Sequence, residues 1–441
     1  MTPEPVAFIH ALRFEQLPAE VVALAKRCLI DLIGVAASGR ETALSRIVHD
    51  FAVAQMGASQ GSARLLFDGR KASRAGAAYA GSSTIDAFDA HDGHRLTKGH
   101  AGVALLPTLL AFAETKPLTG RDLIATLVLG YEIAVRAGMA LHATAPDYHT
   151  SGAWNALGCA AIGARMLGLR RDATRHALGI AEYHGPRSQM MRCIDHPTML
   201  KDGSGWGALA GVSAACLAAD GFTGAPALLI EGAAEATFWR DLGTRWEIAQ
   251  HYLKPYPVCR WAQPAIDATE SLMRQHRLRC DDIAAIEIAT FAAAVRLGTH
   301  PPQSTEQAQY AIGFPVAAMA AHGAFGAAEL SRSGLRDAQT LALLERVRLT
   351  EDADASARFP AERLATVAIT LHDGRRLTSP PTTPRGDPEQ PLSDDEVLMK
   401  FHRLAAALPV ARRDAIERCV LTLETRDDAA RALLDLVLAP P

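Results

Sequence analysis

Residues 86–100 concentrate ionisable side chains in the pattern D-A-F-D-A-H-D-G-H-R-L-T-K-G-H. The segment holds three carboxylates, three imidazoles, one arginine and one lysine, and it runs directly into the apolar stretch 101–113. Charged groups that enter a core are costly unless they are paired, and their protonation equilibria shift. The segment therefore predicts acid–base chemistry, a metal site or both.

Metal binding is one interpretation of this segment. It supplies enough oxygen and nitrogen ligands for a divalent ion, from Asp89, His91, Asp92, His94 and His100. The His91–Asp92 pair in a helical context is also similar to the metal-dependent HD phosphohydrolases, whose sites need further His and Asp residues on separate helices. A solvated helix end is disfavoured, because the flanking sequence is apolar on both sides. We expect no bound metal and keep a metal-dependent hydrolase as the alternative.

Two more polar motifs precede helices made of small residues. His149, Thr150 and Ser151 open the helix predicted over 153–167, and Thr150 or Ser151 is expected to cap it. The amide groups at this helix start favour a carboxylate ligand beside His149. Lys201 precedes a Gly/Ser-rich turn and another predicted helix, where it is either a surface residue or points at a bound carboxylate.

A fourth motif, K-P-Y-P-V-C-R, covers residues 254–260. Its two prolines stiffen the backbone, so that Lys254, Tyr256 and Arg260, with Gln263 following, are expected to face one anion. The same segment also suits a stiff interdomain linker, and both readings can hold because ligand sites often lie at domain interfaces. Motifs typical of nucleotide, flavin or covalent serine chemistry are absent from the sequence.

The elements that must position these motifs are helical up to about residue 265. Apolar residues recur at three- and four-residue spacing after Pro18, and Gly39 is expected to end that helix. Thr119 begins a good N-cap pattern for the next long helix. The Ala- and Gly-rich stretches 153–167 and 207–219 are predicted to be interior helices of a bundle, because small residues let helices approach closely.

After about residue 270 the hydrophobic period becomes strand-like. The expected strands are 283–291 and 364–371, the second continuing as a hairpin, and the expected helical stretches between them are 306–330 and 336–346. A proline-rich stretch follows, and Ser393 caps a final helical tail. The sequence thus predicts a mainly α protein with an all-helical domain over 1–268 and 393–441 and a smaller α+β domain over 269–392.

Composition excludes several classes of protein. The 441 residues are 49% hydrophobic and 21% charged with a net charge of −3, so no basic surface indicates nucleic acid. The stretch 101–113 is too short to span a membrane and contains Pro107, and the first residues do not read as a signal peptide. Seven cysteines without a CxxC pair fit a reducing cytoplasm.

The chain resembles the MmgE/PrpD family over nearly its whole length. The matching motifs occur in the family's order: D-L-I-G-V-A-A-S-G-R at 31–40, the acidic segment leading to G-H-A-G-V-A-L-L-P at 99–107, G-F-T-G-A-P at 221–226, K-P-Y-P-V-C-R at 254–260 with A-I-D-A at 265–268, and A-Q-Y-A-I-G-F-P at 308–315. Each motif is weak alone, and together they form a strong signal.

The resemblance implies a large all-helical domain, a small α+β lid inserted before the C-terminal helices, and a homodimer. It also implies cofactor-free chemistry on small di- or tricarboxylates, as in 2-methylcitrate dehydratase, cis-aconitate decarboxylase and iminodisuccinate epimerase. The family's active-site positions map onto Asp89, His100, His149 and Lys201, in a cleft between the domains.

This chain departs from the family in the acidic segment. The family commonly reads H-x-x-D-x-D-D-T there, whereas this chain has Asp86 where the His falls, His91 where an Asp falls and Gly93 where the Thr falls. We hypothesise that His and Asp have exchanged places and so preserve a pair. Lys98 is an added cation.

The implied chemistry removes or replaces a substituent next to a carboxylate, which needs a base and cations where negative charge grows. We expect His149 to act as the base, His100 as the acid and Lys201 as a carboxylate clamp, with Asp89 and Asp92 orienting the imidazoles. The residues predicted to bind substrate are Lys98, His91, His94, Thr97, Thr150, Ser151, Lys254, Tyr256, Arg260 and Gln263. A carboxylate-binding protein without catalysis on the same scaffold is a further alternative.

Overall fold

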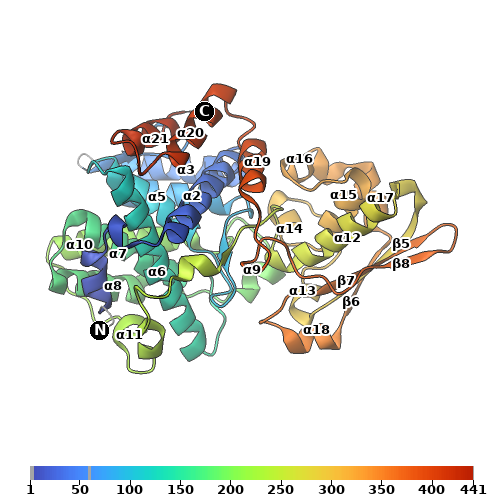
Figure 1. The fold of residues 1–441 in the computed structure, drawn as a ribbon, viewed down its shortest axis with the longest axis horizontal. Helices are drawn as coiled ribbons and strands as arrows, with labels where there is room; N and C mark the ends of the chain where they lie inside the picture. Colours follow the sequence, from blue (N-terminus) through green and yellow to red (C-terminus); the bar gives the residue numbers. More distant parts are fainter. Residues whose placement is uncertain (1–3, 58–60, 441) are drawn as a thin grey trace. The chain divides into compact units, whose positions relative to one another are not determined.

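The computed structural model describes residues 4–57 and 61–440. These residues divide into two compact units (Figure 1). Unit 1 combines the described parts of Met1–Met190, Lys201–Leu253 and Ser393–Pro441, and unit 2 combines Met191–Leu200 with Lys254–Leu392. The chain therefore leaves unit 1 and returns to it for its C-terminal helices.

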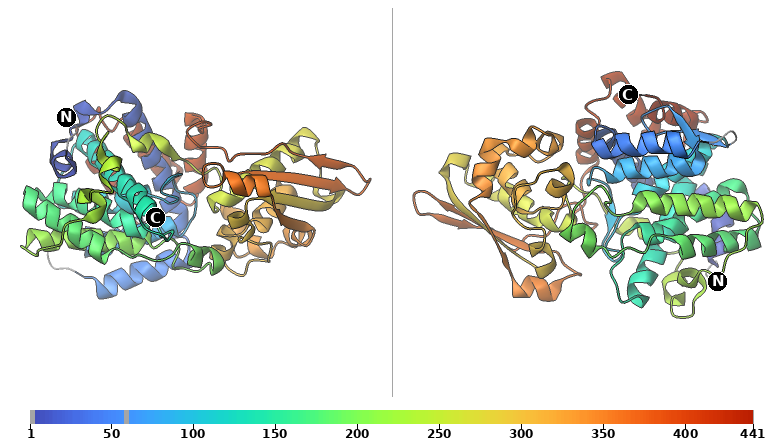
Figure 2. Two further views of the ribbon diagram at one scale, coloured as in Figure 1. Left: turned by 90° about the horizontal axis from the view of Figure 1, so that it is seen from below. Right: turned by 180° about the vertical axis from the view of Figure 1, so that it is seen from behind.

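Unit 1 is a helical bundle (Figure 2). Its helices are α1 Pro5–Ala11, α2 Ala19–Arg40, α3 Ala43–Gln55, α4 Arg74–Asp86, α5 Gly102–Ala113, α6 Gly120–Thr144, α7 Gly152–Leu167, α8 Arg171–His184, α10 Ser204–Ala219, α11 Leu228–Glu231, α19 Asp394–Leu404, α20 Val410–Leu421 and α21 Ala429–Val437. The predicted caps are present, because Thr119 accepts from the Asp122 amide and Ser393 from the Glu396 amide.

Small residues let α7 and α10 pack against each other closely, as their composition predicts. A Cβ atom added at Gly211 of α10 would lie 2.4 Å from the Ala156 carbonyl oxygen, and one at Gly207 would lie 2.6 Å from that of Gly152. Contacts this short exclude any side chain at either glycine. The two helices that begin at the His149 and Lys201 motifs are therefore neighbours in the core of unit 1.

Helix α6 is long and apolar enough to cross a membrane by length and composition alone. However, 94% of its most apolar stretch is buried inside the structure. It packs mainly against α7, with further contacts to α5 and α2. Burial in the bundle core thus accounts for its hydropathy.

Two short antiparallel ribbons complete unit 1. In one of them, β1 Ser62–Arg64 pairs with β2 Lys71–Ser73. In the other, β3 Gly93–His94 pairs with β4 His251–Tyr252, so that Gly93 faces Tyr252 and His94 faces His251. This second ribbon brings residues from far along the chain to the acidic segment.

Unit 2 contains a four-stranded sheet in the order β6-β5-β7-β8. Its strands are β5 Ile283–Thr290, β6 Val347–Glu351, β7 Ala365–Leu371 and β8 Arg376–Thr378, and its helices are α9 Met191–Asp195, α12 Gln263–Gln275, α13 Ala292–Val295, α14 Thr305–Gln309, α15 Gly313–His322, α16 Ala327–Leu330, α17 Ala338–Leu344 and α18 Ala353–Arg358. Helices α12 and α15 pack on one face of the sheet (Figure 2). The mainly α composition with small sheets agrees with the predicted fold class.

The predicted strands and hairpin are confirmed, and the turn between β7 and β8 has Gly374 at φ 88°. Strand β6 escaped the sequence analysis. It pairs parallel to β5 at the sheet edge, and Val347 is its one buried residue. Its sequence, V-R-L-T-E, alternates over only two apolar positions, Val347 and Leu349, directly after the expected helical stretch 336–346, and so short a pattern does not mark a strand by itself.

The division into units differs from the expected one at residues 191–200 and 254–268, which were expected in the helical domain and lie in unit 2. Hydrogen bonds explain the difference at 254–268. The Tyr256 hydroxyl donates to Asp267 and Glu270, at 3.1 and 2.9 Å, and the Cys259 amide donates to the Gln309 carbonyl at 2.8 Å.

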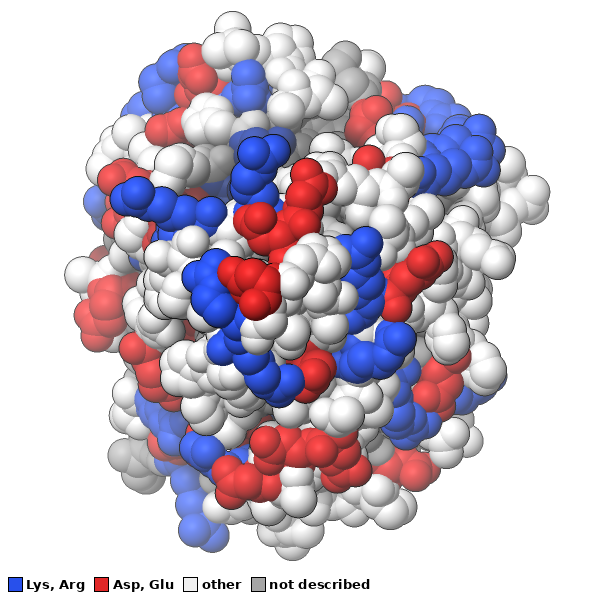
Figure 3. Space-filling model, turned by 90° about the vertical axis from the view of Figure 1, so that its right-hand side faces the viewer, with Lys and Arg blue, Asp and Glu red and all other residues white. Residues whose placement is uncertain are grey.

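On the face shown in Figure 3, Lys/Arg and Asp/Glu side chains are interspersed, and neither sign forms a large patch.

Candidate active site

Residues 87–101 form turns between α4 and α5, with the short strand β3 in the middle. Neither Gly93 nor Gly99 adopts a left-handed conformation, whereas Lys98 does, at φ 50°. The two glycines instead permit close approach. A Cβ at Gly93 would lie 2.3 Å from the Tyr252 hydroxyl, and one at Gly99 would lie 2.4 Å from the Ser151 Oγ.

Four residues of this segment form an imidazole–carboxylate cluster: Asp86, Asp89, His91 and His100. The His91 Nε2 lies 3.5 Å from the Asp86 Oδ1 and 3.6 Å from the Asp89 Oδ1, and the His91 and His100 rings meet edge to face at 4.5 Å between centroids. His91 is fully buried, and neither of its ring nitrogens makes a hydrogen bond within the part of the chain that the structure describes. The cluster therefore gathers titratable groups with unused hydrogen-bonding capacity.

The backbone fixes the orientation of the His100 ring. The Nδ1 lies 2.6 Å from the Asp92 carbonyl oxygen, and the His100 amide donates to the Ser151 Oγ at 2.9 Å. A carbonyl oxygen only accepts hydrogen bonds, so the Nδ1 carries a proton and donates it. Proton exchange by His100 consequently falls to the Nε2.

His149 is held in the same manner. Its Nδ1 lies 2.9 Å from the Asp147 carbonyl oxygen, and its amide donates to the His142 Nε2 at 3.2 Å. Burial, followed by the charge of Lys98, lowers the pKa of His142 to about 4, so this ring is neutral and able to accept. Both histidines proposed for proton transfer thus share one pattern: the Nδ1 lies against a backbone carbonyl, which makes the Nε2 the ring nitrogen able to exchange a proton.

The Lys201 turn meets the start of α7. Lys201 is 3% exposed and has a left-handed backbone at φ 49°. The Gly152 amide donates to the Asp202 carbonyl at 3.2 Å, and the Ser151 hydroxyl donates to the Asp202 Oδ2. Ser151 also accepts from the His100 amide. Ser151 and Asp202 therefore connect the turns that hold His100, His149 and Lys201 at one place in unit 1.

The predicted capping of α7 is wrong. Ser151 does occupy the N-cap position, but its side chain makes no capping hydrogen bond. Its hydroxyl is used by Asp202 and His100 instead. The Thr150 Oγ1 is buried and has no hydrogen-bond partner among the described residues. Local motif rules missed this because both partners of Ser151 are about fifty residues away in sequence.

A second set of ionisable groups, which we call the core network, includes Asp92 and His94 of the acidic segment. Its members are Asp92, His94, Tyr131, Glu132, Arg136, Glu247 and His251. The His94 Nε2 lies 3.4 Å from the Glu247 Oε2, and the His251 Nε2 lies 3.5 Å from the Asp92 Oδ2. Burial lowers the pKa of His94 and, further still, that of His251, so both imidazoles are neutral.

Burial raises the carboxyl pKa values of the core network. The pKa of Asp92 rises to about 6 and that of Glu132 to about 7, opposed in Asp92 by the charge of His91 and in Glu132 by that of Arg136. The Asp92 side chain is thus anchored in the core while its carbonyl holds the His100 ring. It is the Asp92 backbone oxygen, not its carboxylate, that contacts the His100 ring, and the catalytic role expected of the Asp92 side chain stays a prediction.

Two further predicted substrate ligands, Thr97 and Lys98, lie in the turn after β3. The Thr97 hydroxyl donates to the His94 carbonyl at 3.2 Å, and its side chain is fully buried. The Lys98 Nζ lies 4.8 Å from the centre of the Tyr148 ring, and the Tyr148 hydroxyl donates to the Lys98 carbonyl. Whether Thr97, Lys98 or His94 touches substrate stays a prediction.

The four predicted ligands from 254–263 lie in unit 2. Lys254 is fully buried. The Arg260 guanidinium donates to Asp387 at 2.7 Å, to Gln263 at 3.0 Å and to the carbonyls of Pro384 and Arg385. Gln263 in turn donates to the carbonyls of Tyr256 and Val258. Through these contacts Arg260 holds the loop that contains Asp387. Binding of an anion by residues 254–263 stays a prediction.

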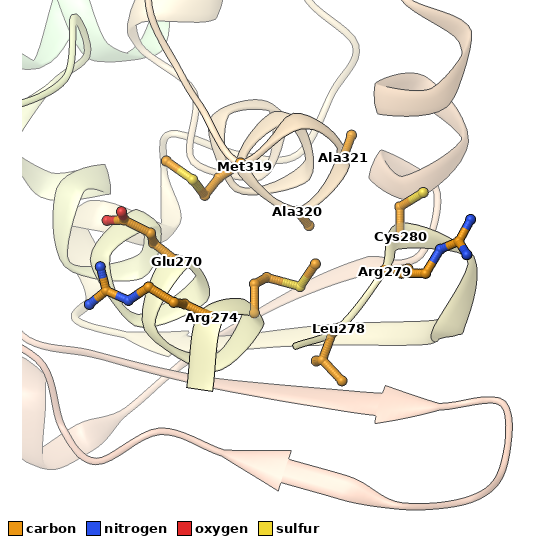
Figure 4. Close-up of a pocket in the computed structure, with 10 residues that line it drawn as sticks. Glu270, Arg274, Leu278, Arg279, Cys280, Met319, Ala320 and Ala321 are labelled. Carbon is orange, nitrogen blue, oxygen red and sulfur yellow. The ribbon is translucent and has the colours of Figure 1, made fainter. Parts of the chain in front are cut away.

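Unit 2 also carries two hollows, of about 480 and 270 Å³. Figure 4 shows the larger, where Met319 and Ala320 face Leu278 and Arg274 across the space. Glu270 and Arg274 line both hollows. The predicted catalytic and substrate-binding residues line neither hollow, although Asp267 and Ala268 of the A-I-D-A motif line the smaller one.

Sequence reasoning missed several members of these networks. Asp202 received no role in the sequence analysis, and its place beside Lys201 at the Gly/Ser-rich turn was the available signal. His142, Glu247 and His251 lie in sequence with no recognisable motif. Only the folded chain brings them next to the acidic segment.

Comparison with known proteins settles the family. The family models described as the MmgE/PrpD N-terminal domain and the MmgE/PrpD C-terminal domain match residues 6–241 and 256–425. The chain belongs to the MmgE/PrpD family. Its family membership accords with the motifs read along the sequence.

Similar MmgE/PrpD proteins include three relatives at low identity. The cis-aconitate decarboxylase-like protein oryM of Aspergillus oryzae is 23% identical, with 98% of this chain and 96% of the relative covered. Cis-aconitate decarboxylase of Aspergillus terreus is 23% identical, over 100% and 96% of the two chains. That of Mus musculus is 25% identical, over 95% and 89%.

Proposed function

We propose that this chain is a lyase or isomerase that acts on a small di- or tricarboxylate by abstracting a proton next to a carboxylate. The cis-aconitate decarboxylase relatives support a lyase-like role. The observation that carries the proposal is the convergence of the His100 turn, the His149–Ser151 turn and the Lys201 turn in unit 1. Dehydration and epimerisation both begin with abstraction of the α proton. Decarboxylation uses the same groups differently: the bond to the departing CO2 breaks, its electron pair stays on the substrate carbon, and an imidazole protonates that carbon.

The proposed chemistry follows from the fixed rings. The His149 Nε2 removes the α proton, and the electron pair left on carbon expels the neighbouring substituent or is reprotonated. The His100 Nε2 delivers a proton to a leaving hydroxyl or to the carbon. Lys201 and Lys98 stabilise the carboxylate on which negative charge grows.

His149 and Lys201 are buried, and His100 and Lys98 are half-buried, so little water surrounds these groups. Ionic interactions strengthen when water is excluded, and a ring that is already oriented needs no reorganisation during the reaction. Asp89, 2% exposed, lies beside the His91 Nε2 in the cluster. Homodimerisation and independence of cofactors remain predictions from the family resemblance, and a cytoplasmic location remains a prediction from the cysteine content.

A nuclear magnetic resonance screen in deuterated water tests the proposal. The purified protein is incubated with hydroxy-, amino- and unsaturated di- and tricarboxylates. We expect deuterium at an α carbon or net conversion for at least one of them, lost in His149→Ala. Tight binding without exchange or conversion would favour the carboxylate-binding alternative. A folded protein that neither binds nor exchanges any acid of the panel contradicts the proposal.

The metal-dependent hydrolase is the second candidate, and one observation favours it. Asp89, His91 and His100 each place one ligand atom within 4.8 Å of the others. The bond from the His100 Nδ1 to a carbonyl is also typical of a metal-bound imidazole. Dialysis against a chelator, with metal analysis before and after, separates the two: unchanged turnover favours the lyase, whereas loss restored by a divalent ion favours the hydrolase.

A further inference from the structure

Asp202 is a buried carboxyl group without a part in the chemistry above. It is 1% exposed and follows Lys201 in the turn before α10. Its Oδ2 accepts from the Ser151 hydroxyl, its carbonyl accepts from the Gly152 amide, and its Oδ1 has no hydrogen-bond partner within the described chain. These hydrogen bonds therefore connect Asp202 to the start of α7.

Ser151 carries the connection onward. Its Oγ accepts the His100 amide at 2.9 Å while its proton goes to Asp202. The packing around the pair leaves little freedom, since a Cβ at Gly99 would lie 2.4 Å from the Ser151 Oγ and one at Gly152 would lie 2.3 Å from the Gly203 carbonyl oxygen. A substitution at Ser151 or Asp202 is therefore expected to shift both the His100 turn and the Lys201 turn.

We propose that Ser151 and Asp202 are a positioning pair, which holds the His100 turn and the Lys201 turn in register at the start of α7. The inference rests on the proposed function, because it assigns the pair to the alignment of that site. Neither residue exchanges a proton with substrate. Their role is to keep the proton donor and the carboxylate clamp at a fixed separation.

The cost of this arrangement argues that it serves function. Burial raises the pKa of Asp202 to about 8, and the charges of Asp86 and Asp89 add to that rise. A Ser–Asn pair would supply the same hydrogen bond without a titratable group among carboxylates. Features that cost folding free energy without a structural need are typical of functional sites.

The groups around Asp202 define its pH dependence. Asp86 and Asp89 face it from the acidic segment, Ser151 faces it from α7, and Lys201 and His100 belong to the turns that it links. Above about pH 8 the pair gains a negative charge beside two existing carboxylates. We expect activity to fall there in the natural chain.

Three variants and one control test the pair. Ser151→Ala removes the acceptor of the His100 amide, Asp202→Leu removes the acceptor of Ser151, and Asp202→Asn keeps that acceptor but cannot ionise. Ser45→Ala is the matched control, since the Ser45 hydroxyl is also buried but bonds to Thr84 at 2.7 Å.

Hydrogen–deuterium exchange of the peptide that contains His100 provides a readout independent of turnover. Loss of one hydrogen bond corresponds to about tenfold faster exchange of that amide. We expect this in Ser151→Ala, a smaller acceleration in Asp202→Leu, and none in Ser45→Ala. Unchanged exchange in Ser151→Ala overturns the pair, whether or not a substrate has been found.

Kinetics supply the second readout. We expect kcat/KM to fall about 10- to 100-fold in Ser151→Ala and Asp202→Leu, because misplacement of reacting groups is costly. Asp202→Asn should retain near-natural activity at pH 7 and lose the alkaline decline. Faster exchange with unchanged kcat/KM in Ser151→Ala would overturn the role in positioning.

Discussion

The acidic segment 86–100 supplies histidines to two different groups of side chains. His91 and His100 enter the imidazole–carboxylate cluster, where the His91 ring nitrogens make no hydrogen bonds to described residues. His94, three residues after His91, enters the core network and lies 3.4 Å from Glu247. Both imidazoles lie near carboxylates, but neither His91 nitrogen makes a hydrogen bond to a described residue, whereas the His94 Nδ1 accepts from the Thr97 amide at 3.4 Å. The His91 ring therefore keeps more hydrogen-bonding capacity for a ligand.

The difference lies in what the rest of the fold supplies. Strand β4 and the residues just before it bring His251 and Glu247 to the His94 side. The His91 side receives Asp86, Asp89 and, through Ser151, Asp202. Similar residue types thus become structural or available for chemistry according to their partners.

The largest expected effect tests the chemical side of this comparison. His149→Ala and Lys201→Ala should each reduce kcat by about 10²–10⁴-fold, the usual loss when a general acid–base group is removed. Steady-state kinetics on the substrate found in the screen measure this. His402→Ala is the control, because His402 is partly exposed and pairs with Glu417 at 2.5 Å. Folded variants with natural turnover would show that the site is assigned wrongly.

The structural side of the comparison is tested by stability. His94→Ala leaves Glu247 buried without its imidazole, and we expect the free energy of unfolding to fall by about 1–3 kcal/mol. His91→Ala likewise leaves Asp86 and Asp89 buried without the imidazole between them, so we expect a comparable loss of stability but a larger loss of turnover than in His94→Ala. Chemical denaturation and kinetics of both variants check this. Equal losses of turnover would erase the distinction between the two groups.

A pH series of Asp202→Asn gives a smaller effect. The pKa of Asp202 in the folded chain is raised from 3.8 to about 8. The folded state therefore keeps a proton that the unfolded state releases, and the cost to stability grows from about pH 4 to about pH 8. The variant should melt at a higher temperature than the natural chain, with a larger gain at pH 8 than at pH 5. A gain that does not vary with pH would place the raised pKa elsewhere.

The smallest expected effect concerns Lys98, which lies between His94 and His100 in the sequence. Its ammonium lies 4.8 Å from the Tyr148 ring centre, a contact worth about 0.5–1 kcal/mol at an exposed site. Lys98→Gln should raise KM a few-fold and leave kcat nearly unchanged if Lys98 binds a carboxylate of the substrate. A kcat loss as large as that of His149→Ala would instead place Lys98 in the proton-transfer step.

Much of the fold was readable from periodicity and caps. The interior helices α7 and α10, the caps at Thr119 and Ser393, and the β7–β8 hairpin all rest on local rules. Strand β6 and the placement of residues 254–268 in unit 2 were not readable, because two alternating apolar positions do not mark a strand and long-range hydrogen bonds leave no local pattern.

The sequence by itself determined which residue types surround the chemistry: histidines, carboxylates and lysines at the starts of helices built from small residues. It also determined the family, because ordered motifs survive along the whole chain. Only the tertiary structure decided that His94 pairs with Glu247, that Ser151 serves Asp202 and His100 instead of its own helix, and that two imidazoles present the Nε2. The physical reason is that the partner of a buried polar group is supplied by whichever distant segment packs against it.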